Sequence, residues 1–213
     1  MITRDIDELR LILENTPTFC TIHHIVPWKW NEDKHREFML RDQFVDMYHT
    51  YTKETASIIK EISNKPVIVI PHWVNSKIWH PLDKKKCREE LGLGEDKFII
   101  GSFQRDTEGS DLKSPKLEKG PDIFIEMCKE FNMNKWNVEV LLGGNRRQFV
   151  INELNRLGIS YKYFENSPTE SVNKMYSACD LYAVSSRCEG GPQAIFEASA
   201  TKTSIISTDC GQS

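Results

Sequence analysis

The pattern of apolar and polar positions is most regular in the C-terminal two thirds of the chain, where short apolar runs alternate with amphipathic stretches. Strands are predicted over 97–103, 137–143, 159–164, 180–186 and 203–208. Helices are predicted over 84–91, 121–131, 148–157, 169–178 and 192–200. Apolar strands separated by helices are typical of a parallel sheet covered on both faces. The predicted fold class is therefore α/β, with a doubly wound, Rossmann-like parallel sheet.

The preceding part of the chain is less regular. Strands are predicted over 19–22 and 67–70, and helices over 38–47, over 52–62 and from Asp5 onward. Asp5-x-Asp7 can be interpreted as a metal pair, but we favour helix capping because a helical period follows it. Residues 72–86 have no clear period and are interpreted as a connection between domains. The domain prediction is 1–78 and 79–213.

Several residues at helix ends have the chemistry of caps. Gly92 and Gly158 are predicted to end helices, and Ser167 to Glu170 is predicted to form a capping box with proline at the first helical position. We interpret Arg146-Arg147 as a solvated helix turn rather than a ligand site.

Composition excludes some classes of partner. The 28 Lys and Arg against 31 Asp and Glu give a net charge of −3, too little positive field to hold a nucleic acid or an anionic membrane. The six cysteines include no C-x-x-C pair, which indicates a reducing compartment. There is no apolar run of membrane-span length, and residues 1–15 are too charged for a signal peptide. We therefore expect a cytoplasmic location.

Charged residues and glycines follow three of the predicted strands, 97–103, 137–143 and 180–186. Ligands of open parallel sheets bind beyond the carboxyl ends of the strands. Arg105 follows strand 97–103, and Lys119 precedes the next helix. If Gly191 is the N-cap of helix 192–200 and Pro192 its first residue, the helix end presents free N–H groups that attract an anion. With Arg105 and Lys119 nearby, these features predict a diphosphate clamp.

Two glutamates bracket the same helix start. Glu189 lies in the loop before the helix and Glu197 in its second turn, and carboxylates accept hydrogen bonds from the hydroxyls of a sugar or ribose. A nucleotide diphosphate with a sugar at each end fits this arrangement. The competing interpretations are a solvated helix start for Lys119 and an exposed helix position for Glu197.

The order of these motifs resembles the retaining glycosyltransferases of the family 4 type. The resemblance runs from about residue 16 to the C-terminus, includes "VIVIPHWVNSKIWHPL" and "REELGLGEDKFIIGSFQR", and is most specific in the Glu-x7-Glu unit of "CEGGPQAIFEASA". Such enzymes have the GT-B fold, with two facing Rossmann-like domains and a nucleotide-sugar on the C-terminal one. The resemblance therefore implies that 79–213 is the donor-binding domain and 1–78 a remnant of the acceptor-side domain.

The resemblance also implies roles for individual residues. Arg105 and Lys119 would hold the diphosphate, Glu197 the ribose hydroxyls and Glu189 the transferred sugar, with help from the backbone near Gly190 and Gly191. His23, after strand 19–22, matches the acceptor-side histidine of the family. His24 points to the other side of the strand. Retention is expected without a protein nucleophile, a catalytic metal or a cofactor other than the nucleotide-sugar donor.

Departures from the family pattern leave alternatives open. The chain reads Lys202-Thr203-Ser204 where the family usually has Gly-x-Pro, and Gly211-Gln212 where it has Gly-Gly. Several N-terminal strands and the final helices of the family are also missing, so we expect a chain truncated at both ends. The acceptor, a glycan, a lipid or a small molecule, is not identified. Any peripheral membrane contact would be made through the missing N-terminal half. The alternatives are a GT-B-type sugar-nucleotide epimerase and a non-catalytic nucleotide-sugar-binding fragment.

Overall fold

The computed structural model describes residues 13, 16–110 and 112–211. The helix predicted from Asp5 and the Asp5-x-Asp7 pair lie outside the described residues. The chain divides into two compact units, the first formed by residues up to His72 together with Cys188–Gly191, and the second by Trp73–Arg187 and Pro192–Gly211. Among the described residues, no helix combines the length and the apolar character needed to cross a lipid bilayer.

The second unit contains a five-stranded sheet in which every pair of neighbours is parallel. Its strand order is β6-β5-β4-β7-β8. The strands are β4 Phe98–Ser102, β5 Val138–Gly143, β6 Ser160–Phe164, β7 Leu181–Val184 and β8 Ser204–Ser207. The chain adds strands outward from β4 on one side and then, after β6, on the other, which confirms the predicted doubly wound α/β sheet.

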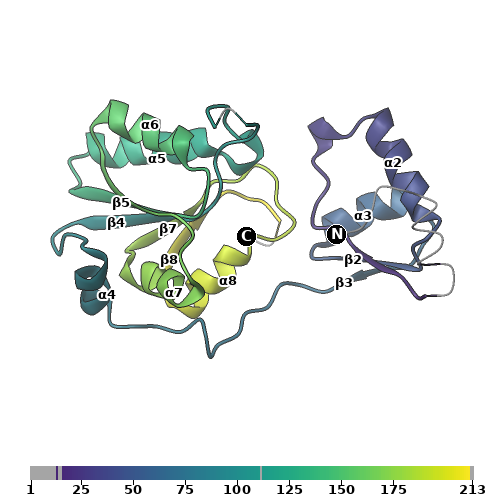
Figure 1. Cartoon of the computed structure of the whole chain (residues 1–213), viewed down its shortest axis with the longest axis horizontal. Coiled ribbons are helices and arrows are strands. Elements are labelled where there is room, and N and C mark those ends of the chain that lie inside the picture. Colours follow the sequence, from purple (N-terminus) through teal and green to yellow (C-terminus); the bar gives the residue numbers. More distant parts are fainter. Residues whose placement is uncertain (1–12, 14–15, 111, 212–213) are drawn as a thin grey trace. The chain divides into compact units, whose positions relative to one another are not determined.

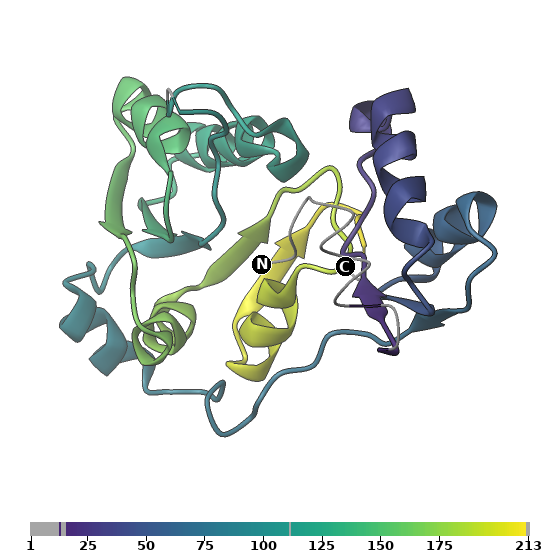
Figure 2. The same cartoon turned by 45° about the vertical axis from the view of Figure 1, so that its right-hand side comes forward.

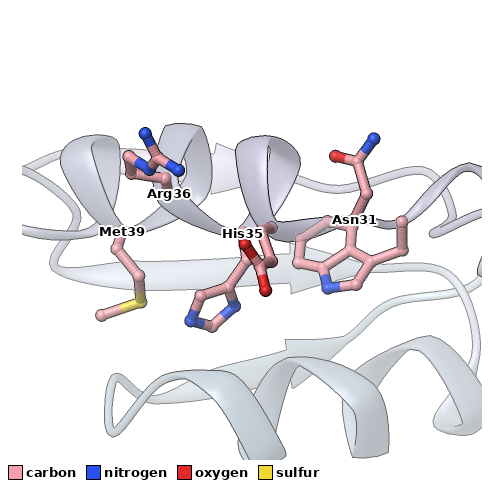
Figure 3. Close-up of a pocket in the computed structure, with 6 residues that line it drawn as sticks. Asn31, His35, Arg36 and Met39 are labelled. Carbon is pink, nitrogen blue, oxygen red and sulfur yellow. The ribbon is translucent and has the colours of Figure 1, made fainter.

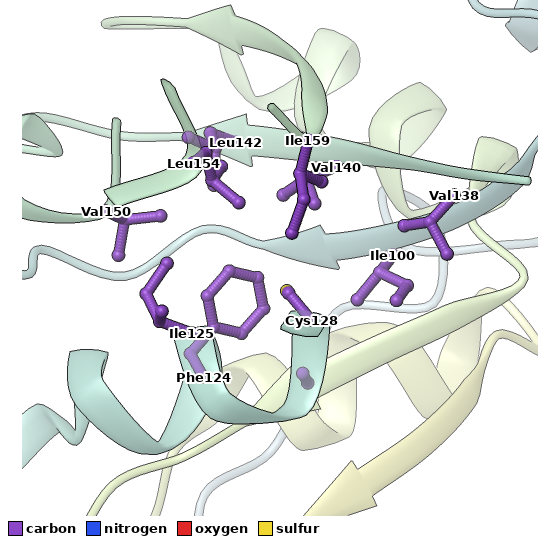
Figure 4. Close-up of a cluster of buried hydrophobic side chains, with 11 residues drawn as sticks. Ile100, Phe124, Ile125, Cys128, Val138, Val140, Leu142, Val150, Leu154 and Ile159 are labelled. Carbon is purple, nitrogen blue, oxygen red and sulfur yellow. The ribbon is translucent and has the colours of Figure 1, made fainter. Parts of the chain in front are cut away.

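Helices cover both faces of this sheet, α5 and α6 on one and α4, α7 and α8 on the other (Figures 1 and 2). Their bounds are α4 Lys84–Leu91, α5 Pro121–Met133, α6 Gln148–Leu157, α7 Thr169–Ala178 and α8 Gln193–Ala200, with a short 3-10 helix, η2, at Leu117–Lys119. The largest apolar cluster lies under α5 and α6, where Ile100 and Val140 from the sheet pack with Phe124 and Leu154 (Figure 4). Because both faces are covered, the central strands β4, β5 and β7 are accessible to solvent mainly where they begin and end.

The helix ends confirm some predicted caps and correct others. Gly92 and Gly158 take the left-handed conformation that ends α4 and α6, as predicted. The capping box at α7 is wrong, because Pro168 itself is the N-cap and no side chain caps the helix. Pro192 is likewise the N-cap of α8, so that helix begins one residue later than predicted.

The connection between the units is anchored on α7 of the second unit. Asn173 accepts a hydrogen bond from the backbone N–H of His80 at 3.4 Å and donates to its carbonyl at 3.2 Å. Ser177 Oγ accepts from the N–H of Leu82 at 3.2 Å, and the ring of Trp79 lies buried edge-on against Tyr176. The stretch from Trp79 onward is therefore part of the second unit's structure.

The first unit contains a parallel three-stranded sheet in the order β1-β2-β3. Its elements are β1 Phe19–Thr21, η1 Pro27–Lys29, α2 Glu32–Asp42, β2 Met47–Thr50, α3 Lys53–Ile62 and β3 Val67–Val69. Thr52 caps α3 by accepting a hydrogen bond from the N–H of Thr55. Tyr48 and Ile59, both fully buried, lie in the core of this unit.

The bounds of the helix predicted over 38–47 are wrong, because α2 begins at Glu32 and ends at Asp42 and residues 47–50 form the central strand β2. Asn31 caps α2 by accepting from the N–H of Lys34 at 3.0 Å. At the other end, the buried Asp42 carboxylate accepts from Tyr48 Oη at 2.8 Å and from Ser63 Oγ at 2.6 Å. These bonds join the end of α2 to β2 and to the end of α3.

Candidate functional site

A cleft of about 290 Å³ opens at the carboxyl ends of β4, β5 and β6. It is lined by Phe103, Arg105, Gly143, Gly144, Asn145, Asn166, Ser167, Val172 and Met175. The lining combines one cation and several amide or hydroxyl groups with an apolar base, a composition common in sites for small polar ligands. Its position agrees with the rule that ligands of open parallel sheets bind beyond the carboxyl ends of the strands.

Arg105 is exposed at this cleft, three residues beyond Ser102, the last residue of β4. Gly144, on the facing loop, has φ +82°, and a Cβ placed there would lie 3.1 Å from the carbonyl oxygen of Phe103. A residue with a side chain would therefore be strained at this position and would also press on the neighbouring loop. The glycine lets the loops after β4 and β5 approach each other closely.

Lys119 ends η2, which is held against the end of β7 by its backbone. The carbonyl oxygen of Lys119 accepts from Gln104 Nε2 at 2.9 Å and from Ser185 Oγ at 3.1 Å. Gln104 also accepts from Ser186 Oγ at 3.2 Å. Gln104 therefore joins the loop after β4, the turn that carries Lys119 and the last residues before the β7–α8 loop.

Gly120 makes this close approach possible. It adopts φ +57°, and a Cβ there would lie 1.8 Å from the carbonyl oxygen of Ser185. Arg187 reinforces the same junction: its N–H donates to the carbonyl of Glu118 at 2.8 Å, and its guanidinium donates to both carboxylate oxygens of Asp122 at 2.7 and 2.5 Å. The position of the Lys119 backbone is thus fixed from two sides.

Glu197 lies in the second turn of α8, as predicted, and is neither fully exposed nor fully buried. Its Oε2 accepts a hydrogen bond of 2.9 Å from Tyr176 Oη. Burial raises the pKa of the Glu197 carboxyl above its usual range, and the hydrogen bond from Tyr176 opposes that shift. The Tyr176 ring is fully buried and packs edge-on against Phe103, with ring centroids 4.8 Å apart.

Three consecutive residues after β4 connect these groups within the second unit. Phe103 contacts the tyrosine that holds Glu197, Gln104 holds the carbonyl of Lys119, and Arg105 lines the cleft. Arg105, Lys119 and Glu197 are therefore tied to one short segment, although they are up to 92 residues apart in the sequence. Gln104 and Tyr176 were not predicted as site residues, and the position of Gln104 at a strand end is the signal that could have identified it.

The remaining predicted site residues belong to segments of the first unit. His23 follows β1, and its ring centroid lies 5.2 Å from that of Tyr51. Glu189, Gly190 and Gly191 lie in the loop that leads from β7 to α8. Their roles stay predictions.

The interpretation of Arg146-Arg147 as a solvated turn is wrong for Arg147. Its side chain is only 1% exposed and is paired with an Asp106 carboxylate that is 2% exposed. The buried guanidinium finds its acceptors in the ends of two strands and in a loop some 40 residues away, so no local pattern reveals it.

A second pocket, of about 570 Å³, lies on α2 of the first unit. Figure 3 shows His35 and Met39 pointing to one side of the helix, and Arg36 and Asn31 to the other. None of the predicted site residues lines it. The cleft in the second unit is therefore the better candidate site.

Comparison with known proteins agrees with this location. The family model for glycosyl transferases group 1 matches residues 83–213, which is more than half of the chain and includes the whole cleft. A D-inositol 3-phosphate glycosyltransferase of Segniliparus rotundus is 26% identical over 151 residues, covering 67% of this chain and 32% of that relative. An alpha-galactosylglucosyldiacylglycerol synthase of Streptococcus pneumoniae is 27% identical over 170 residues, covering 70% of this chain and 39% of that relative. The chain thus spans about a third of the length of these relatives.

Solved structures show the same fold. Anabaena Alr3699/HepE in complex with UDP-glucose superposes with a TM-score of 0.76 at 19% identity, over 98% of this chain and 59% of that one. WaaG, a glycosyltransferase involved in lipopolysaccharide biosynthesis, superposes with a TM-score of 0.67 at 14% identity, over 89% of this chain and 53% of that one. The α/β fold therefore matches that of GT-B glycosyltransferases, and the match of the family model shows that this chain belongs to the group 1 glycosyl transferases.

Proposed function

We propose that this chain binds a nucleotide-diphosphate sugar in the second unit and takes part in transferring the sugar, with retention, to an acceptor, in the manner of family 4. The observation that carries the proposal is the segment Phe103 to Arg105, which ties a cleft-lining cation, the Lys119 turn and the Glu197 carboxylate to one strand end. A nucleotide-diphosphate sugar offers a doubly charged diphosphate for the two cations and two ribose hydroxyls for the carboxylate.

The proposed donor site has three parts. The base would enter the cleft beside Asn166 and Ser167, where backbone groups of residues 163–168 would contact it. Glu197, oriented by Tyr176, would accept from the ribose hydroxyls with its other oxygen. Arg105 and Lys119 would hold the diphosphate. Support for this class of donor comes from HepE, which was solved with UDP-glucose and with UDP.

The proposed chemistry needs no protein nucleophile. The acceptor hydroxyl would attack from the face of the leaving group, and the donor phosphate would help to remove its proton. Arg105 and Lys119 would stabilise the negative charge that develops on the departing diphosphate, so a catalytic metal is not part of the proposal. Glu189 would contact the transferred sugar, with backbone N–H groups near Gly190 and Gly191 on the diphosphate.

His23 would lie on the acceptor side. The acceptor itself, a glycan, a lipid or a small molecule, is not specified by the second unit. An acceptor-free incubation with a nucleotide-sugar tests the epimerase alternative, because an epimerase would produce a new nucleotide-sugar without any acceptor.

A thermal-shift panel of UDP, GDP and ADP tests the donor site. A ligand at 100 times its Kd stabilises the folded state by about 2.7 kcal/mol, which raises the melting temperature measurably. Lys119→Ala and Glu197→Ala should remove the shift produced by the best nucleotide. Lys129→Ala, on the exposed side of α5, should keep it, because Lys129 pairs with Glu126 of its own helix and does not line the cleft. A shift that persists in both site variants would overturn the assignment.

A further inference from the structure

Arg147 and Asp106 form a buried ion pair, and Arg147 bonds to Gly143, a residue that lines the candidate cleft. Arg147 Nε donates to Asp106 Oδ2 at 2.9 Å. The guanidinium also donates to the carbonyl oxygens of Ser102 and Gly143, the last residues of β4 and β5, with 3.0 Å to Gly143, and to Ser102 Oγ at 3.1 Å. One side chain therefore fixes the spacing between the ends of two neighbouring strands.

Asp106 extends this network into both loops. Its Oδ1 accepts from the N–H of Phe149 in α6 at 3.3 Å, and its own N–H donates to the carbonyl of Arg146 at 3.1 Å. Its carbonyl accepts from the N–H of Lys116 at 2.8 Å, which connects the pair to the segment leading into η2. The loop 103–106 is thus held at Ser102 before Arg105 and at Asp106 after it.

The buried pair is costly to desolvate, so the stability of the fold is a weak explanation for its presence. Removing two charges from water is unfavourable, and a pair of apolar side chains of similar volume often stabilises a fold equally well or better. The residues joined by the pair adjoin or belong to the cleft lining, which includes Phe103 and Arg105 on one loop and Gly143 to Asn145 on the other. Strand pairing alone does not fix the conformation of these loops, because both lie beyond the last residues of β4 and β5.

We propose that Arg147 and Asp106 are positioning residues, which hold Arg105 and the loop after β5 at the separation that a bound nucleotide requires. The proposal rests on the proposed donor site. Neither residue lines the cleft, so both would act through Arg105 and through the backbone at Gly143 and Gly144. Their removal should weaken nucleotide binding even where the protein stays folded.

The chain contains a control ion pair at the other end of the same sheet, where the strands begin. Arg88 is also buried and donates to the carbonyls of Ala178, Glu95 and Lys97, and its Nη2 pairs with Asp180 at 2.5 Å. Asp180 accepts from the N–H of Ile99, near the start of β4. This pair has comparable bonding, with side chains 10% and 24% exposed against 1% and 2% for Arg147 and Asp106. It lies away from the cleft, so its loss should affect stability alone.

The test compares Arg147→Met with Arg88→Met by nucleotide titration calorimetry. Measurements are made well below the melting temperature of each variant, with UDP, GDP and ADP as ligands and the folded fraction checked by circular dichroism. Arg88→Met should bind with wild-type affinity. Arg147→Met should bind about 10-fold or more weakly, which corresponds to a loss of about 1.4 kcal/mol or more of binding free energy. Equal affinities in the two variants would overturn the proposal.

Two further variants separate positioning from folding. The double variant Arg147→Met with Asp106→Leu removes both charges and should regain much of the stability lost in Arg147→Met, because no unpaired buried charge remains. Its affinity should stay low, and recovery of wild-type affinity would contradict positioning. If Arg147→Met does not fold, Arg147→Lys and Ser102→Ala provide milder changes to the same bonds, again expected to weaken binding. A wild-type protein that binds none of the three nucleotides would instead refute the proposed function, and this inference with it.

Discussion

Gly120→Ala is the sharpest test of how the Lys119 turn is built. Gly120 has φ +57°, where a residue with a Cβ costs roughly 1–2 kcal/mol. The new Cβ would also lie 1.8 Å from the carbonyl oxygen of Ser185. Real Cβ contacts below 3.0 Å are essentially never seen, so the turn must move away from β7 by at least about 1.2 Å. Such a displacement breaks the hydrogen bonds from Gln104 and Ser185 to the carbonyl of Lys119.

The matched control for this change is Gly158→Ala. Gly158 has φ +66° and nothing within 4 Å of the position of its Cβ, so alanine there carries the conformational cost without the clash. Forcing extra volume into a packed site typically costs about 1–3 kcal/mol. We therefore expect Gly120→Ala to lower the free energy of unfolding by roughly 2–5 kcal/mol and Gly158→Ala by roughly 1–2 kcal/mol.

Urea unfolding followed by circular dichroism measures both free energies, and calorimetry with the best nucleotide measures binding. Gly120→Ala should lose affinity because its Lys119 turn is displaced, whereas Gly158→Ala, at the far end of α6, should bind normally. Equal destabilisation in the two variants, together with equal nucleotide affinity, would refute the close packing of the turn against β7.

Three other predictions concern the groups around α8 and η2. Tyr176→Phe removes the hydroxyl that donates to Glu197 Oε2, and a hydrogen bond to a charged group contributes about 1.5–3 kcal/mol. Nucleotide affinity at neutral pH should therefore fall about 10-fold or more. An unchanged Kd by calorimetry would contradict the ribose assignment. Glu197→Gln removes a carboxyl whose folded-state pKa is raised by burial, and the stability from such a group is lost as pH rises through that pKa. The melting temperature of the variant relative to wild type should therefore increase with pH. A constant difference between the two melting temperatures would argue against the raised pKa. Arg187→Ala breaks an ion pair with Asp122 whose side chains are 37% and 42% exposed. The free energy of unfolding should therefore fall by about 1 kcal/mol or less, and by less still at high salt. A fall of several kcal/mol in urea unfolding would show that this ion pair stabilises the junction more than its exposure predicts.

The second unit could be predicted from sequence almost to the residue because its signals are local. The apolar runs of β5 and the proline and glycine at the ends of α5 and α6 each specify their own element. The first unit was harder. Residues 47–50 show the alternation of a strand, with Tyr48 and Thr50 buried and their neighbours less so, but the helical residues before them obscured it. The short β2 is specified largely by its two partner strands.

The candidate site divides in the same way. The charged residues and glycines at strand ends could be identified from their positions, since the carboxyl edge of a parallel sheet collects them. What could not be predicted is which groups hold them. The acceptors of Arg147 and the contacts of Gln104 come from residues that are distant in sequence, and they depend on how two loops pack.

The two buried arginines lie at opposite ends of the strands, one linked to the beginning of β4 and the other to its last residue. Asp180, held by Arg88, binds the N–H of Ile99, and Arg147 binds the carbonyl of Ser102. β4 also pairs with β5 on one side and β7 on the other. Both of its ends and both of its sides are therefore held by hydrogen bonds. Its amide hydrogens should therefore exchange with solvent deuterium only when the whole unit unfolds, whereas those of the edge strands β6 and β8 can exchange through smaller, local openings.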